Sequence, residues 1–278
     1  MLKRTITSVV SVCILLPVLF FSHTVALPIA LALVTCIALY EIYKCIGVHK
    51  KYYFCIPAYV FAVAAPFLLR YCDGKMCFSI AFIYAAAYLL YLFMITVWQK
   101  GSVKFSKTSE FFAATLYIIA ALNSILYIRD LENGGKYLYL LIFIGAWMTD
   151  IFAYLTGMLL GKHKLIPEVS PKKTIEGSVG GTLFCVLSFV VFGIVVDSFF
   201  ATDANLIFLA ISGVFVAIVA QMGDLIMSLI KREYGIKDYG KLFPGHGGVL
   251  DRFDSILAVS LMLAIICVFA GIINISLI

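Results

Sequence analysis

The residues between 228 and 255 concentrate groups that can bind a phosphate or a divalent cation. Asp251 and Asp254 lie three positions apart, which is about one helical turn, with Arg252 between them. We expect a helix to start here, and carboxylates at a helix N-terminus are stabilised in their ionised form. Paired carboxylates with open positions suit Mg²⁺, which takes oxygen ligands from the protein and from substrate phosphates. The spacing therefore predicts a metal and phosphate site, with ordinary first-turn acids as the alternative.

A third carboxylate, Asp224, lies within an apolar stretch that ends at this basic segment. It shares one helical face with Gln221, Ser228 and Lys231, because these residues follow one another at intervals of three and four. A carboxylate that faced lipid alone would be costly, and a metal ion or a cationic partner removes that cost. Asp224 is therefore a predicted third metal ligand, and an Asp–Lys pair without chemistry is the alternative.

Another polar face occurs in the apolar run that ends near Gly161. Asp150, Tyr154, Gly157 and Gly161 lie on one side of the predicted helix. An ionisable residue at this depth usually faces a cavity or a partner. The two glycines also allow a neighbouring helix to approach closely. The face is interpreted either as one wall of a site or as a helix-packing seam.

Two connections carry the remaining polar motifs. The segment 170–174, Ser-Pro-Lys-Lys-Thr, places two cations before a predicted helix start, which is a natural phosphate site. A basic loop is also what membrane topology alone would produce. The segment 244–248, Pro-Gly-His-Gly-Gly, allows the backbone to come close to a ligand.

The composition determines the solvent in which these residues must be positioned. Apolar residues make up 63% of the 278 residues and charged residues 13%, and the mean hydropathy is +1.07. A water-soluble fold could not bury so much apolar surface, and a disordered chain would not contain it. The net charge of +6 fits membrane orientation and anionic lipid or substrate, so it does not call for a nucleic-acid partner.

Apolar runs of about 20 residues are long enough to cross a bilayer as helices. The sequence has nine such runs, near residues 6–23, 25–45, 52–70, 76–98, 110–128, 137–160, 177–199, 205–230 and 255–277. We therefore expect an all-α integral membrane protein with about nine transmembrane helices.

Charge asymmetry predicts the orientation of these helices. With nine spans, seventeen of the 21 Lys and Arg residues fall in connections on one side. The positive-inside rule then places the N-terminus and the loops 161–176 and 231–254 in the cytoplasm. Residues 1–136, about five spans, are almost uniformly apolar. Residues 137–278, about four spans, carry the polar motifs, so we expect the catalytic region and its active site there, at the cytoplasmic face.

Residues 228–254 resemble the signature of the phosphatidate cytidylyltransferase family, also called CDP-diacylglycerol synthases. The family pattern is Ser, two residues, Lys-Arg, then Lys-Asp, then His-Gly-Gly, then Asp-Arg-x-Asp. The matching residues are Ser228, Lys231, Arg232, Lys237, Asp238, Gly240, Pro244, His246, Gly247, Gly248, Asp251, Arg252 and Asp254. The segments 170–174 and 221–224 are similar to the family as well, so the resemblance covers about residues 145–255.

The resemblance implies transfer of a cytidylyl group from CTP to phosphatidic acid, which gives CDP-diacylglycerol and pyrophosphate for phospholipid synthesis. Asp224, Asp251 and Asp254 would hold one or two Mg²⁺ ions. His246 would contact the triphosphate or stabilise the leaving pyrophosphate. The other implied site residues neutralise or hydrogen-bond phosphate: Ser170, Lys172, Lys173, Ser228, Lys231, Arg232, Lys237, Arg252 and the backbone of Gly247 and Gly248.

Other classes of membrane protein fit the sequence less well. A CTP-using polyprenol kinase would release CDP in place of pyrophosphate. A CDP-alcohol phosphotransferase has a different aspartate pattern, which is missing because Ser255 and Ile256 follow Asp254. A transporter would line a path across the whole membrane, whereas the polar residues here gather at one face.

The resemblance also implies partners and a location. CTP, phosphatidic acid and the lipid bilayer are the expected partners, and nucleic acid is not. The apolarity of residues 5–136 permits a homodimer. We expect a multi-pass protein of a bacterial inner membrane.

The predicted orientation can be tested by labelling single cysteines with a maleimide that does not cross membranes. After Cys72 and Cys77 are replaced, a Cys at Asn133 or Asp203 should react in intact cells. A Cys at His163 or Tyr239 should react only after the membrane is opened. Reaction at position 163 or 239 from outside would invert the orientation and separate both motif loops from cytoplasmic nucleotide.

Overall fold

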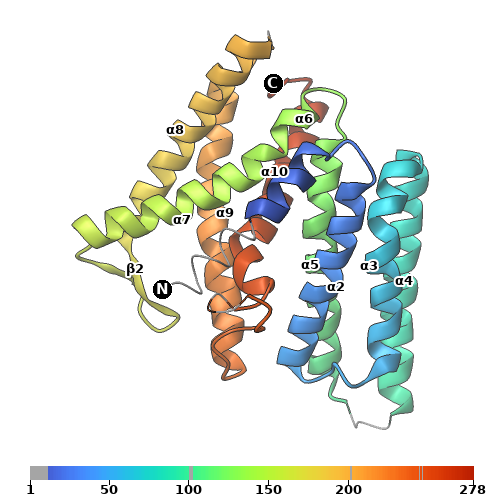
Figure 1. Ribbon diagram of the computed structural model, residues 1–278. Helices are drawn as coiled ribbons and strands as arrows, with labels where there is room; N and C mark the ends of the chain where they lie inside the picture. The colour runs from blue at the N-terminus through green and yellow to red at the C-terminus, as the bar shows by residue number, and fades with distance from the viewer. Residues whose placement is uncertain (1–11, 100–102, 201, 244, 246) are drawn as a thin grey trace. The chain divides into compact units, whose positions relative to one another are not determined.

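The computed structural model describes residues 12–99, 103–200, 202–243, 245 and 247–278, and helices dominate this part of the chain (Figure 1). Residues 12–20 are helical. The further helices are α2 Ala26–Ile46, α3 Tyr52–Tyr71, α4 Gly74–Trp98, α5 Phe105–Arg129, α6 Gly135–Leu138, α7 Leu140–Leu160, α8 Ile175–Phe200, α9 Leu206–Glu233 and α10 Leu250–Ile272.

Membrane-spanning length is confirmed for eight segments of the described chain. They correspond to the eight predicted spans after the first, and each boundary lies within five residues of its prediction. The first predicted span, near 6–23, begins outside the described residues. Many apolar side chains on these helices are exposed, including Leu159 at 74% and Val179 at 65%. Such exposure is expected of surfaces that face lipid tails.

A short hairpin departs from the predicted all-α fold. Strand β1, Lys164–Ile166, pairs antiparallel with β2, Ser170–Thr174, within the segment predicted as a basic loop. The prediction of a helix start after this segment is confirmed, since α8 begins at Ile175. Thr174 caps α8: its Oγ1 accepts a hydrogen bond from the Gly177 amide at 3.1 Å.

The chain folds into two compact units. The first contains Met1–Leu126 and Tyr234–Arg252, and the second contains Tyr127–Glu233 and Phe253–Ile278. A division by composition at residue 136 places the loop before α10 in the C-terminal half. In the structure this loop belongs with the N-terminal helices, because polar side chains of α2 and α5 bind it.

Buried aromatic rings form the core of the first unit. Tyr43 of α2 packs on Phe111 of α5 with ring centroids 4.4 Å apart, and Phe54 of α3 meets Phe111 edge-on. The Tyr43 hydroxyl lies 2.8 Å from Thr115 Oγ1, so its polar end is also satisfied. These contacts join α2, α3 and α5 into one body.

Close contact between α7 and α8 organises the second unit. A Cβ added at Gly181 of α8 would lie 2.7 Å from the Thr149 carbonyl oxygen and 3.0 Å from the Ala153 Cβ of α7. Phe152 and Phe184 stack with ring centroids 3.8 Å apart. Since helices in lipid associate mainly through packing, small residues at such contacts permit the approach.

We expect Gly181→Val to destabilise the protein by about 1–3 kcal/mol, because the added side chain overlaps backbone of α7. The measurement is thermal unfolding of the detergent-purified protein. Gly271→Val in α10 is the matched control, since no atom lies within 4 Å of a Cβ there. Equal melting temperatures for the two variants would show that the α7–α8 contact tolerates the larger residue.

Candidate active site

A cavity of about 500 Å³ lies within the second unit, between α7, the hairpin, α8 and α9. It combines lysines with carboxylates, which suits a ligand that carries phosphates and a bound cation. Its polar and charged lining residues include Asp150, Tyr154, Lys164, Lys172, Lys173, Thr174, Ser178, Gln221 and Asp224. The sequence left the polar face of α7 open between a site wall and a packing seam, and the structure shows both. Asp150 and Tyr154 line the cavity, while Gly157 also packs on the start of α8.

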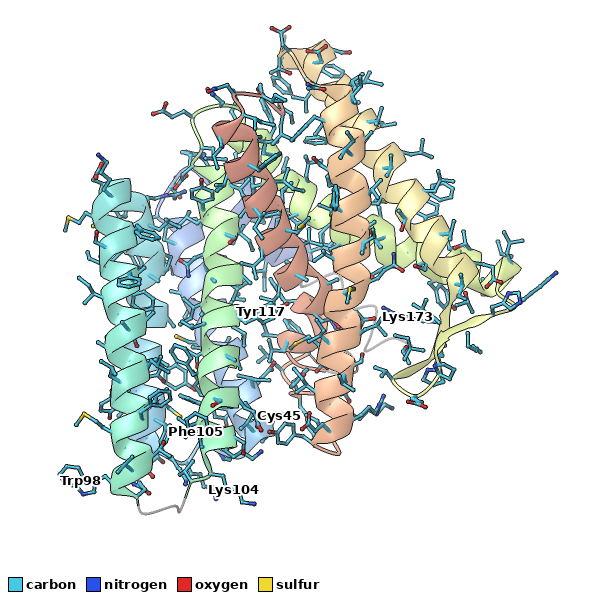
Figure 2. All side chains as sticks on the ribbon, turned by 180° about the vertical axis from the view of Figure 1, so that it is seen from behind. Cys45, Trp98, Lys104, Phe105, Tyr117 and Lys173 are labelled. Atoms are coloured by element: carbon cyan, nitrogen blue, oxygen red, sulfur yellow. The ribbon has the colours of Figure 1, made fainter. Side chains whose placement is uncertain are left out.

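An ion pair joins two of the predicted site residues inside this cavity. Lys173 of β2 lies beside α9 (Figure 2), with its Nζ 2.7 Å from Asp224 Oδ2. The same ammonium group donates to the Gln221 carbonyl oxygen at 3.2 Å. The cationic partner required by Asp224 therefore comes from the basic segment 170–174, and the pair attaches the hairpin to α9.

Two further carboxylates interact electrostatically with Asp224. Asp254 of α10 interacts with both Asp224 and Asp150, and Lys231 is its attractive neighbour. Ser255 connects the carboxylates, since its Oγ donates to Asp150 Oδ2 and its amide donates to Asp254 Oδ1, both at 2.9 Å. Helices α7, α9 and α10 thus each supply one carboxylate to this cluster.

The carboxylate cluster offers the oxygen ligands that Mg²⁺ prefers. Asp150, Asp224 and Asp254 have more negative charge than Lys173 and Lys231 balance, if all five groups are ionised. The described residues contain no ready-made group of three His, Cys, Asp or Glu side chains in metal-binding geometry. The residue types therefore fit a divalent ion that is also coordinated by substrate phosphate. The predicted metal ligands stay predictions.

In the first unit, Asp251 organises the loop that precedes α10. It is 7% exposed, and its Oδ2 accepts hydrogen bonds from the Tyr239 amide at 2.8 Å and the Gly248 amide at 2.9 Å. Gly247 adopts a positive φ of 89°, and a Cβ there would lie 2.7 Å from the same oxygen. The glycine is required by the loop conformation itself.

The two predicted glycine donors form hydrogen bonds inside the loop. The Gly247 amide donates to the Phe243 carbonyl at 3.1 Å, and Phe243 returns a bond of 2.9 Å to Gly247. The Gly248 amide is directed to Asp251. In this conformation both N–H groups stabilise the loop, and their binding to phosphate remains a prediction.

The other predicted site residues occupy several places. In the second unit, Ser228 lies 3.5 Å from Asp224, Lys231 and Arg232 form the last turn of α9, and Ser170 and Lys172 lie on β2. In the first unit, Lys237 and Arg252 are exposed. His246 lies outside the described residues.

Sequence reasoning missed the polar groups that hold the ends of the 234–249 loop. Tyr234 is bound by Lys107 at 2.6 Å and by Glu110, both from α5. At the other end, Glu41 of α2 accepts hydrogen bonds from the start of α10. The available signal was an acidic residue inside a predicted span, and Glu41 is such a residue.

Comparison with known proteins identifies the family. The Cytidylyltransferase family matches residues 2–270. The phosphatidate cytidylyltransferase of Staphylococcus haemolyticus (strain JCSC1435) is 33% identical over 266 residues, which cover 95% of this chain and 98% of that protein. That of Staphylococcus aureus (strain COL) is 31% identical over 268 residues with the same coverage. That of Bacillus subtilis (strain 168) is 37% identical over 171 residues, 62% of each chain. This chain belongs to the Cytidylyltransferase family of membrane enzymes.

We expect Lys173→Met to destabilise the protein by about 1–2 kcal/mol, because it leaves the Asp224 carboxylate without its partner. The cost is moderate since the two side chains keep 23% and 28% of their exposure. Thermal unfolding measures it, and Asp224→Asn in the same background should restore part of the loss. Lys172→Met is the control, since this exposed neighbour forms no ion pair with another described residue. Equal losses for Lys172→Met and Lys173→Met would mean that the ion pair contributes nothing.

Proposed function

We propose that the chain is a phosphatidate cytidylyltransferase that converts CTP and phosphatidate into CDP-diacylglycerol and pyrophosphate. The observation that carries this proposal is the similarity to proteins of that name over 95% of the chain. The cavity supports it, since lysines and carboxylates meet there among membrane-spanning helices. Both substrates are polyanions, and one of them is a lipid.

The reaction calls for positioning and charge neutralisation. A phosphate oxygen of phosphatidate forms a bond to the α-phosphorus of CTP, while the bond to the β-phosphate oxygen breaks and pyrophosphate leaves. The attacking phosphate is already ionised near neutral pH, so a strong general base is not required. The protein must align the two phosphates and compensate the charge that accumulates between them.

The lysines of the hairpin are suited to bind phosphate. Lys164, Lys172 and Lys173 line the cavity, and an incoming phosphate competes with Asp224 for Lys173. Lys231, Arg232 and Arg252 supply further positive charge, and Ser170 and Ser228 supply hydroxyl donors. These assignments place phosphate binding on β2 and at the ends of α9 and α10.

A divalent cation, Mg²⁺, is the proposed cofactor. Asp224 and Asp254 would hold it together with Asp251, and it would neutralise and orient the phosphates when bound. Asp150 is within electrostatic reach of Asp224 and Asp254 and adds negative charge to the same cluster. The location that suits this chemistry is the inner membrane of a bacterium, with the motif loops facing cytoplasmic CTP. A homodimer is compatible with the exposed apolar helix faces.

The decisive assay supplies CTP and phosphatidate to the purified full-length protein and measures released pyrophosphate and CDP separately. We expect pyrophosphate alone, loss of activity with a chelator, and recovery with Mg²⁺. Asp224→Asn, Asp251→Asn and Asp254→Asn should each lower the rate at least about 100-fold, because amides bind Mg²⁺ weakly. Asp203→Asn, in an exposed loop, is the matched control.

Two results would contradict this proposal in different ways. Release of CDP would identify a kinase and refute cytidylyl transfer. Activity near wild type in one aspartate variant would remove that residue from the site while leaving the reaction assignment intact.

A further inference from the structure

Glu41 is a buried carboxylate in the half of the chain that otherwise consists of apolar spans. It lies in the last part of α2 and is 4% exposed. Its Oε1 accepts a hydrogen bond from the Val249 amide at 3.0 Å, and its Oε2 accepts one from the Leu250 amide at 2.8 Å. Leu250 is the first residue of α10, so Glu41 satisfies amides at a helix start, where no intrahelical acceptor exists. All of these residues belong to the first unit.

The signature loop is moulded around this carboxylate. A methyl group at Gly240 or at Gly248 would overlap the Glu41 carboxyl group. Both positions are glycines of the signature, and the space that a side chain would need is filled by a residue about 200 positions earlier in the chain. Part of the signature is therefore fixed by Glu41 through packing.

Glu41 and Asp251 divide three consecutive amides between them. The Gly248 amide binds Asp251, and the Val249 and Leu250 amides bind Glu41. The two carboxylates repel each other, while Lys44 attracts Glu41. Hydrogen bonds from backbone amides to an ionised acceptor are strong enough to oppose such repulsion. The direction in which α10 leaves the loop thus depends on two carboxylates acting together.

We propose that Glu41 is a positioning residue of the cytidylyltransferase reaction, which sets the start of α10 and thereby the orientation of Asp251 and Asp254. It acts through the loop and does not contact substrate. The inference rests on the proposed catalytic role of these aspartates. A carboxylate that only stabilised the fold would change the yield of folded protein without changing the rate of each folded molecule.

Glu41→Gln tests the role directly, because the amide keeps the shape but can accept only one of the two hydrogen bonds. On the monodisperse, purified full-length protein we expect kcat to fall at least about tenfold, with KM for CTP and phosphatidate within about threefold of wild type. Hydrogen exchange should become faster in a peptide that contains Val249 and Leu250. Thr35→Val is the matched control in α2, since this buried hydroxyl bonds only within its own helix, to the Leu31 carbonyl. It should leave kcat within about twofold.

A size exchange gives a second, independent test of the same contact. Gly248→Ala should lower kcat at least about tenfold, because its methyl group overlaps Glu41. Adding Glu41→Asp withdraws the carboxylate by one methylene, so the double variant should regain at least about threefold over Gly248→Ala alone. If Glu41→Gln yields no monodisperse protein, this pair of variants decides the question.

The outcomes separate this inference from the proposed function. An unchanged kcat in Glu41→Gln, or no gain in the double variant, would overturn the positioning role. If Asp251→Asn and Asp254→Asn are inactive while Glu41→Gln is normal, only the inference about Glu41 fails. If the aspartate variants retain wild-type activity, the proposed catalytic role of the loop fails, whatever Glu41 does.

Discussion

An ionised carboxylate among apolar helices must have a partner, and this constraint governs the polar structure of the protein. The partners differ from case to case. Asp224 has the Lys173 ammonium group, Asp150 has the Ser255 hydroxyl, and Glu41 has two backbone amides. Since no water is available in the hydrocarbon region, each carboxylate also fixes the element that supplies its partner. The hairpin is attached in this way, and so is the start of α10.

The same contacts combine stability with chemistry. Lys173 balances Asp224, yet it lines a cavity that suits phosphate, so a bound phosphate would replace an internal anion. Such exchange lets a cationic site stay compensated between turnovers. It also limits how tightly a product phosphate is held, because Asp224 competes for the same ammonium group.

Much of this organisation was predictable from the sequence because membrane spans have a strong signal. Apolar length alone located eight helices within a few residues, and one-face spacing identified Asp150 and Asp224 as inward-facing groups. The hairpin was not predictable, because Pro171, Lys172 and Lys173 have little strand preference. Its pairing depends on tertiary contacts such as the one between Lys173 and Asp224. Glu41 was missed for a related reason: its partners are backbone amides about 200 residues away, and backbone amides have no sequence signature.

The link between Glu41 and the start of α10 has a consequence for the order in which the protein can form. Helix α2 is synthesised and inserted long before the ribosome reaches residue 249. Throughout that interval Glu41 lacks its two native amide partners, so the early helices carry an uncompensated acid or a protonated one. Translation of the last loop supplies the missing donors. The N-terminal helices therefore reach their final, charge-satisfied state only when the chain is almost complete, and a chain that stops before the loop cannot reach it.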